Sequence, residues 1–210
     1  LSTALKEKDK EEEAQEVLQK AISIDSGNAI SHYYLAAVFA KLGKTEESAT
    51  SYKIATELDP KLAGAHLGLG HVLKTLGDVD AGIAAYRQAI NLRPNFGEIY
   101  FSLSNLKTFR FTDDEIKDMA SRIDQEKLDT DSVVHFAFSL GKAYEDNKDY
   151  DKAFEYYSRG NEEHRNLISY DPVQTELAHE KLKETFTQEF FENIKTCLLY
   201  TSDAADDALS

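Results

Sequence analysis

The sequence predicts an all-α fold built from repeated helical hairpins. Windows 29–62 and 63–96 match each other at a step of 34 residues, and each changes halfway from one apolar stripe to another. The coinciding positions are small, apolar, aromatic or proline residues: Leu35 with Leu69, Gly43 with Gly77, Tyr52 with Tyr86, Ala55 with Ala89 and Pro60 with Pro94. The composition, 41% apolar and 30% charged with three prolines, is typical of a globular, helix-rich chain.

This arrangement resembles the tetratricopeptide repeat (TPR) family, in which a 34-residue period carries small, aromatic, small and proline positions in the same order. The resemblance implies that each repeat is a helical hairpin and that the hairpins stack into a right-handed superhelical solenoid. It therefore implies a scaffold for binding and does not name a reaction.

Each window carries the signals of two helices. In the first window we expect a helix from about residue 30 to 42, which Gly43 ends in the left-handed conformation. Thr45 is the predicted cap of the next helix, which ends before Asp59-Pro60 because proline disfavours the α conformation in the preceding residue. Gly77-Asp78 repeats the stop and the cap in the second window.

Small residues recur where the two helices of a hairpin are expected to cross. They are Ala36 or Gly70, Ser48 or Gly82, and Ala55 or Ala89. Glycine costs up to about 1 kcal/mol relative to alanine inside a helix. Close approach of the helix axes is the compensation that we expect for the glycines of the second window: Gly64, Gly68, Gly70 and Gly82.

The repeat pattern slips after residue 104 and then returns. Lys107 stands where a core side chain is expected, and a new helix begins at Thr112, which forms a capping-box pattern with Glu115. A further helix is predicted after Asp171-Pro172. The predicted segments are a partial TPR at 1–28, TPRs at 29–62 and 63–96, a degenerate helical repeat at 97–130, a TPR-like hairpin at 131–170, a C-terminal helix at 171–196 and a tail at 197–210.

The tail has a different character from the rest of the chain. The run from Cys197 to Asp207 resembles the conceptual translation of a transposase adapter used to build sequencing libraries. We therefore expect the natural sequence to be cut near Thr196 and the tail to be no part of the fold. Because Cys197 is the only cysteine, this expectation leaves no thiol on which to base a redox argument.

Charge narrows the classes of partner. The net charge of −14 disfavours nucleic acid and anionic membrane, because both require a concentrated basic face. No run approaches the roughly 18 apolar residues of a membrane span, and residues 1–10 lack the apolar core of a signal peptide. We expect a cytoplasmic protein.

The sequence offers no catalytic, cofactor-binding or metal-ligating residue that we would assign. The six histidines show no metal-ligand spacing, and the glycine run at 64–70 lacks the Lys-Ser/Thr end of a phosphate loop. His32 and His66 occupy equivalent positions in the first helices, where a large aromatic residue usually packs, so we predict that both are core residues.

The predicted binding site is the concave face of the solenoid, formed by side chains of the first helices beside the packing stripe. These residues are Ile30, Tyr33, Ala37, Lys41, Leu67, His71 and Lys74. A groove with aliphatic, aromatic and cationic groups suits an extended peptide, although the same pattern also fits ordinary half-exposed helix residues. TPR domains that grip a C-terminal carboxylate use lysine and asparagine where Tyr33 and Ala37 stand, so that type of chaperone docking is not expected.

The second half carries a further resemblance. Residues 100–111, 135–146, Tyr170-Asp171-Pro172 and Phe190-Phe191 occur in an order that resembles the region joining the TPR array to the catalytic domain of bacterial TPR-containing sulfotransferases. The resemblance implies a parent enzyme that transfers sulfonate from PAPS, with the PAPS site in a domain beyond this chain. The chain itself would present the acceptor or another protein.

Two alternatives remain open from the residues. One is a free-standing TPR adaptor without enzymatic activity. The other is self-association through the C-terminal helix and Phe190-Phe191.

Overall fold

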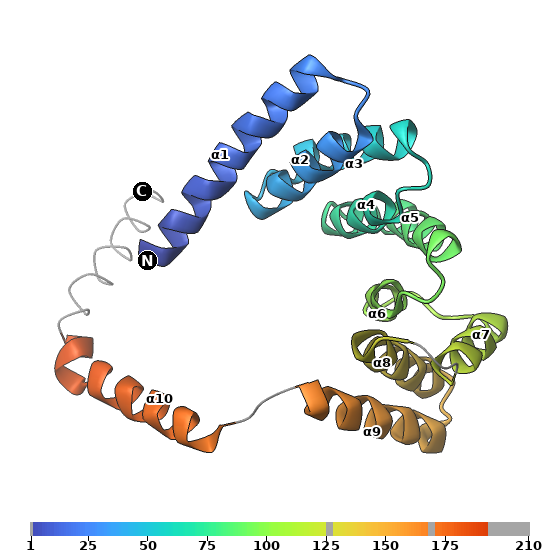
Figure 1. Cartoon of the computed structure of the whole chain (residues 1–210). Coiled ribbons are helices and arrows are strands. Elements are labelled where there is room, and N and C mark those ends of the chain that lie inside the picture. The colour runs from blue at the N-terminus through green and yellow to red at the C-terminus, as the bar shows by residue number, and fades with distance from the viewer. Residues whose placement is uncertain (1, 125–127, 168–170, 193–210) are drawn as a thin grey trace, which may run out of the picture. The chain divides into compact units, whose positions relative to one another are not determined.

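The computed structural model describes residues 2–124, 128–167 and 171–192, and for residues 2–9 it describes the backbone alone. Across these ranges the chain is helical and contains no strand (Figure 1). Two units are distinguished, residues 1–167 and residues 168–210, and each is described by itself. The predicted tail from Cys197 lies outside the described residues.

Successive helices of the first unit pack against one another as hairpins. They are α1 (Ser2–Ile24), α2 (Ala29–Lys41), α3 (Thr45–Leu58), α4 (Ala63–Thr75) and α5 (Val79–Leu92). Helix α2 packs on α3, α4 packs on α5, and α3 joins the two pairs by packing on α4. The first helices α2 and α4 also contact each other, so they share one side of the stack.

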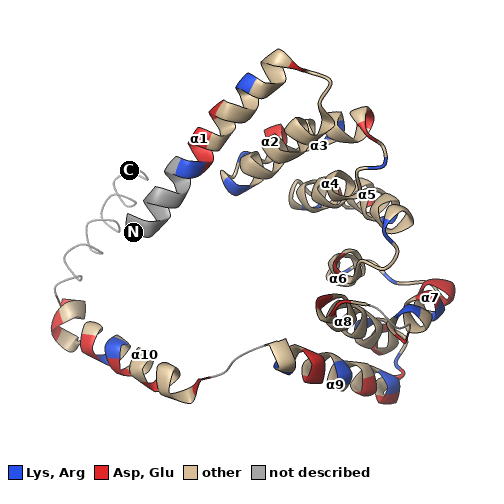
Figure 2. Ribbon diagram, in the orientation of Figure 1, with Lys and Arg blue, Asp and Glu red and all other residues tan. Residues whose placement is uncertain are grey.

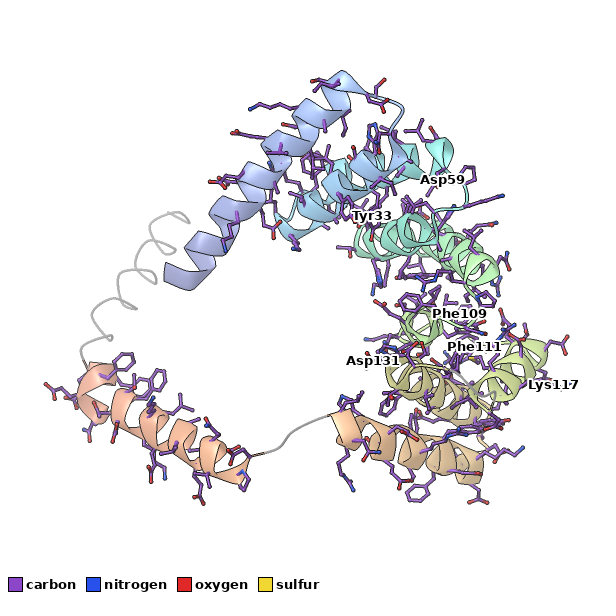
Figure 3. The ribbon with its side chains drawn as sticks, viewed as in Figure 1. Tyr33, Asp59, Phe109, Phe111, Lys117 and Asp131 are labelled. Atoms are coloured by element: carbon purple, nitrogen blue, oxygen red, sulfur yellow. The ribbon has the colours of Figure 1, made fainter. Side chains whose placement is uncertain are left out.

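The slipped repeat is a short helix followed by an irregular connector and a displaced helix. Helix α6 (Gly97–Ser104) packs on α5 and on α8 (Thr130–Asp146), while α7 (Asp113–Ile123) packs on α8, which pairs with α9 (Tyr150–Leu167). Phe109 and Phe111 of the connector are buried with their rings edge to face, 4.9 Å between centroids (Figure 3). The residues that break the repeat pattern therefore supply core of their own.

The turns between paired helices follow the predicted chemistry with one exception. Gly43 and Gly77 adopt φ values of 73° and 86°, and Lys148 takes the corresponding place in the last hairpin at 62°. Asp78 caps α5 by accepting from the Ala81 N–H at 3.3 Å. The predicted Thr45 cap is wrong, because Lys44 is the N-cap residue and the Thr45 hydroxyl turns back to donate to the Gly43 carbonyl.

Other predicted helix starts are confirmed. Thr112 and Glu115 form the reciprocal capping box at the start of α7. In the second unit, the Asp171 side chain accepts from the backbone N–H groups of Val173 and Gln174, and Pro172 opens α10 (Pro172–Thr185). None of the residues of α10 is buried.

Small residues allow the paired helices to approach closely, as predicted. Ala36, Ser48 and Ala55 are fully buried in the first hairpin, where the Ser48 hydroxyl donates to the Ala36 carbonyl at 2.7 Å. In the second hairpin, a Cβ added to Gly82 would lie 3.2 Å from the Gly70 carbonyl oxygen. The backbones are therefore nearly in contact at this crossing.

Glycines on the first helices also make room for tyrosine rings of the second helices. A Cβ on Gly70 would lie 2.7 Å from the ring of fully buried Tyr86, and one on Gly141 would lie 2.5 Å from Tyr157. Gly68 makes the same kind of room for Tyr52, which belongs to the preceding hairpin. These contacts explain why poor helix formers occupy helical positions.

A side-chain hydrogen bond ties the start of each of three first helices to the turn before it. His32 Nε2 lies 3.1 Å from the Ser26 carbonyl oxygen, and His66 Nε2 lies 3.0 Å from that of Pro60. One repeat later, the hydroxyl of Tyr100 donates to the Pro94 carbonyl at 3.2 Å. His32 is buried as predicted, whereas His66 is only partly buried.

We expect Gly70→Ala to lower the free energy of unfolding by about 1–3 kcal/mol, the usual cost of overpacking a filled core. Helix propensity alone would give the opposite sign, a gain of up to about 1 kcal/mol. Urea denaturation followed by circular dichroism measures the change. Ala84→Gly on an exposed position of α5 is the control for propensity, and stabilisation by Gly70→Ala would contradict the packing role of Gly70.

Candidate binding groove

The predicted groove residues lie on one side of the first helices. Tyr33 of α2 and Leu67 of α4 occupy equivalent positions, and both are half-buried. The structure adds Phe101 of α6 and Phe138 of α8 at the same position, also half-buried. We call these four residues the groove row; each hairpin contributes one partly exposed apolar side chain to it.

Tyr33 sits where the first two hairpins meet. Its ring lies 5.1 Å from that of Tyr34 and 6.0 Å from that of Tyr52, measured between centroids. A Cβ on Gly64 of α4 would lie 3.3 Å from the Tyr33 ring, so the tyrosine packs across onto the next first helix (Figure 3). Tyr33 therefore combines a structural contact with a partly exposed surface.

His71 is held by a tyrosine from the second helix of its own hairpin. The hydroxyl of Tyr86 lies 3.0 Å from His71 Nδ1, and the two rings meet edge to face at 5.4 Å. Burial raises the pKa of Tyr86 to about 12, so its hydroxyl stays protonated and either donates to an unprotonated Nδ1 or accepts from a protonated one. The other ring nitrogen, Nε2, takes the complementary role, donor in the first case and acceptor in the second.

The surroundings of His71 favour the neutral imidazole. Burial lowers its pKa below the ordinary value of 6.5, and the positive charge of Lys74 lowers it further, while Glu98 of α6 acts in the opposite direction. At neutral pH the imidazole is therefore uncharged.

The other predicted groove residues differ in their exposure and in their ion pairing. Ile30 is exposed, Ala37 is half-buried and Lys74 is exposed near the end of α4. Lys41 instead forms an ion pair with Glu11 of α1 at 2.8 Å, so part of its charge is already compensated.

The groove row continues into a pocket between α6 and α8 that the sequence prediction missed. Its volume is about 250 Å³, and it is lined by Phe101, Ser104, Asn105, Lys107, Phe138, Lys142 and Tyr157. Adding 34 to Leu67 reaches Phe101, and adding the offset of 71 that relates the last hairpin to the second reaches Phe138. The repeat spacing therefore points to both phenylalanines, but the irregular connector between them interrupts the pattern.

Charged residues of both signs are interspersed along α7 and α9, with no continuous basic stripe among the described helices (Figure 2). No described helix combines the length and apolar character needed to cross a membrane.

Comparison with known proteins identifies the repeats. A family model described as "TPR repeat" matches residues 39–77, and one described as "Tetratricopeptide repeat" matches residues 1–28, 63–96 and 134–162. Together they cover more than half of the chain. The chain belongs to the tetratricopeptide repeat family. It is a TPR scaffold, and the proteins of this family bind other proteins.

Solved structures confirm the predicted all-α TPR solenoid. The crystal structure of MamA is 21% identical, covers 74% of this chain and 90% of its own, and superposes with a TM-score of 0.58. MamA 41-end from Desulfovibrio magneticus RS-1 is 19% identical, covers 76% of this chain and 88% of its own, and superposes with a TM-score of 0.57. The crystal structure of BtubC (BKLC) from P. vanneervenii is 16% identical, covers 69% of this chain and 66% of its own, and superposes with a TM-score of 0.51. At these identities the similarity establishes the fold alone, and among curated proteins no match is found.

The charges around His71 predict how its titration responds to mutation. We expect an NMR titration to give His71 a pKa below 6.5, raised by Lys74→Gln and lowered by Glu98→Gln. Because the folded state binds this proton less readily than the unfolded state, the contribution to stability is complete above pH 6.5 and decreases as the pH falls below it. Equal titration of His71 in both variants would contradict this electrostatic account.

Proposed function

We propose that the chain binds an extended segment of a partner protein along the groove row. The observation that carries this proposal is the equivalence of Tyr33, Leu67, Phe101 and Phe138, which expose one apolar surface per hairpin. Packed helices lie about 8–10 Å apart, and an extended chain rises about 3.3 Å per residue. Roughly every third residue of such a segment would therefore meet a groove-row side chain wherever two first helices are in contact.

Two kinds of group support recognition of a peptide. Partly exposed aromatic and aliphatic side chains supply apolar area, and the neutral His71 offers its Nε2 for a hydrogen bond with a peptide group. Both are held by contacts within the array, Tyr33 by Gly64 and His71 by Tyr86. A groove ordered before binding loses less conformational entropy when it binds.

Tyr33→Ala combined with His71→Ala tests the groove. Peptides selected from a displayed random library on the full chain would be titrated against both proteins, and we expect the double variant to bind at least about tenfold more weakly, about 1.4 kcal/mol. Helicity by circular dichroism should remain unchanged. Tyr150→Ala, an exposed tyrosine at the start of the second helix α9, is the matched control. Unchanged affinity in the double variant would refute the proposed groove.

We further propose that this scaffold is the substrate-presenting arm of a PAPS-dependent sulfotransferase. The support is the succession of motifs from residue 100 to Phe191, which resembles the joining region of that family. In that reading the PAPS site belongs to a following domain, and this chain contributes the groove. Sequencing the gene past codon 196 tests it. A stop codon soon after that point, without a strand and a glycine-rich phosphate loop, would favour the free-standing adaptor instead.

Helix α10 supports a separate proposal of self-association. Val173, Leu177 and Phe186 are each about half exposed or more, and the rings of Phe186, Phe190 and Phe191 gather within 6.1 Å of one another. Such exposed apolar groups favour association with a second copy.

Sedimentation of the full chain tests this association. We expect a concentration-dependent dimer that Leu177→Glu with Phe186→Glu converts to a monomer. A wild-type protein that remains monomeric at all concentrations would rule the association out.

A further inference from the structure

The pocket between α6 and α8 has the size of a single side chain. Its volume of about 250 Å³ lies below the roughly 300–1,000 Å³ of sites that enclose a drug-sized ligand. Three of its walls are aromatic, with centroid distances of 6.3 Å from Phe101 to Phe138 and 6.3 Å from Phe138 to Tyr157. These rings are already in contact with one another, so they form one aromatic wall against which an incoming aromatic side chain can pack.

Contacts with glycines of α8 and α9 hold these aromatic rings in place. The Tyr157 ring lies directly over Gly141, where a Cβ would approach it to 2.5 Å, and its hydroxyl donates to Glu145 Oε2 at 2.8 Å. A Cβ on Gly160 would lie 3.4 Å from the Phe138 ring. The pocket is therefore formed before any ligand arrives, which reduces the entropy lost on binding.

The rim of the pocket is cationic in a chain whose net charge is −14. Lys142 of α8 and Arg110 of the connector share one carboxylate, that of Asp146, with the arginine Nε at 3.4 Å. Lys107 is exposed, and no carboxylate pairs with it among the described residues. The lining of the pocket therefore contains two lysines, Lys107 and Lys142, and no acidic side chain.

Lys107 differs in position from the lysines that lie in the last turn of a helix. Lys41 and Lys74 lie in the last turns of α2 and α4, where a cation is favoured by the helix dipole. Helix α6 ends at Ser104, so Lys107 lies beyond it in the connector. The slip in the repeat has placed this positive charge beside an aromatic pocket.

We propose that this pocket is the anchor subsite of the groove and takes an aromatic side chain of a partner segment with a carboxylate residue beside it. The proposal rests on the proposed function, because it assumes that a peptide follows the groove row. It adds the chemistry of the partner, in which an aromatic ring packs against the wall formed by Phe101, Phe138 and Tyr157. The neighbouring carboxylate meets Lys107 and Lys142.

Selection of a displayed random peptide library on the full chain tests the proposal. We expect the enriched peptides to contain an aromatic residue with Asp or Glu within about three positions. Lys107→Glu should weaken a selected peptide roughly tenfold and reduce the salt dependence of its binding. Lys117→Glu is the matched control, because Lys117 lies on α7 outside the pocket lining and pairs with exposed Asp114 at 3.7 Å (Figure 3).

A double-mutant cycle keeps the aromatic part of the test independent of folding. Replacing the peptide's aromatic residue by alanine should weaken binding to the wild type roughly tenfold, and much less to Phe138→Ala, if the two rings are in contact. Equal losses on both proteins would overturn the assignment of the pocket.

The outcomes separate this inference from the proposed function. Peptides that require Tyr33 and His71 but ignore Lys107→Glu and Phe138→Ala would overturn the anchor subsite and leave the groove intact. Enrichment of basic peptides would likewise overturn the inference alone. Failure to enrich any peptide would count against both.

Discussion

The contact of a tyrosine ring with a glycine backbone is the constraint on which this structure depends. Tyr86 of α5 lies on Gly70 of α4, and Tyr157 of α9 lies on Gly141 of α8, with no room for a Cβ in either case. The ring fixes how closely the two helices of a hairpin approach. Because each hairpin packs on its neighbour, the helix spacing within one hairpin also affects how the next hairpin docks.

The same tyrosines connect the core to the proposed binding face. The Tyr86 hydroxyl forms a hydrogen bond with His71 Nδ1, and the Tyr157 hydroxyl donates to Glu145 beside the pocket. In the first hairpin Tyr52 packs on Gly68 of the following hairpin, which couples two repeats, and its ring also lies 6.0 Å from that of groove-row Tyr33. The tyrosine at this repeat position therefore makes different contacts in each hairpin.

The slipped repeat gives the proposed groove its distinct chemistry. Shortening α6 places Lys107 and Arg110 in a connector, and buried Phe109 and Phe111 hold that connector in the core. The Arg110 guanidinium then reaches Asp146 at the end of α8. A regular repeat would have continued the helix through this point, with a core side chain in place of Lys107.

Sequence by itself determined the helical hairpins, the left-handed turns at Gly43 and Gly77, and the caps at Asp78, Thr112 and Asp171. These features depend on groups within about four residues of one another, so spacing alone reveals them. The Thr45 cap was wrong because Lys44 ends the turn and the hydroxyl bonds backwards. Only the tertiary structure decided that Lys41 pairs with Glu11 and that Phe101, Phe138 and Tyr157 form one pocket. Those contacts join side chains about 20 to 60 positions apart, and the packing of whole helices, which no local pattern encodes, sets their distances.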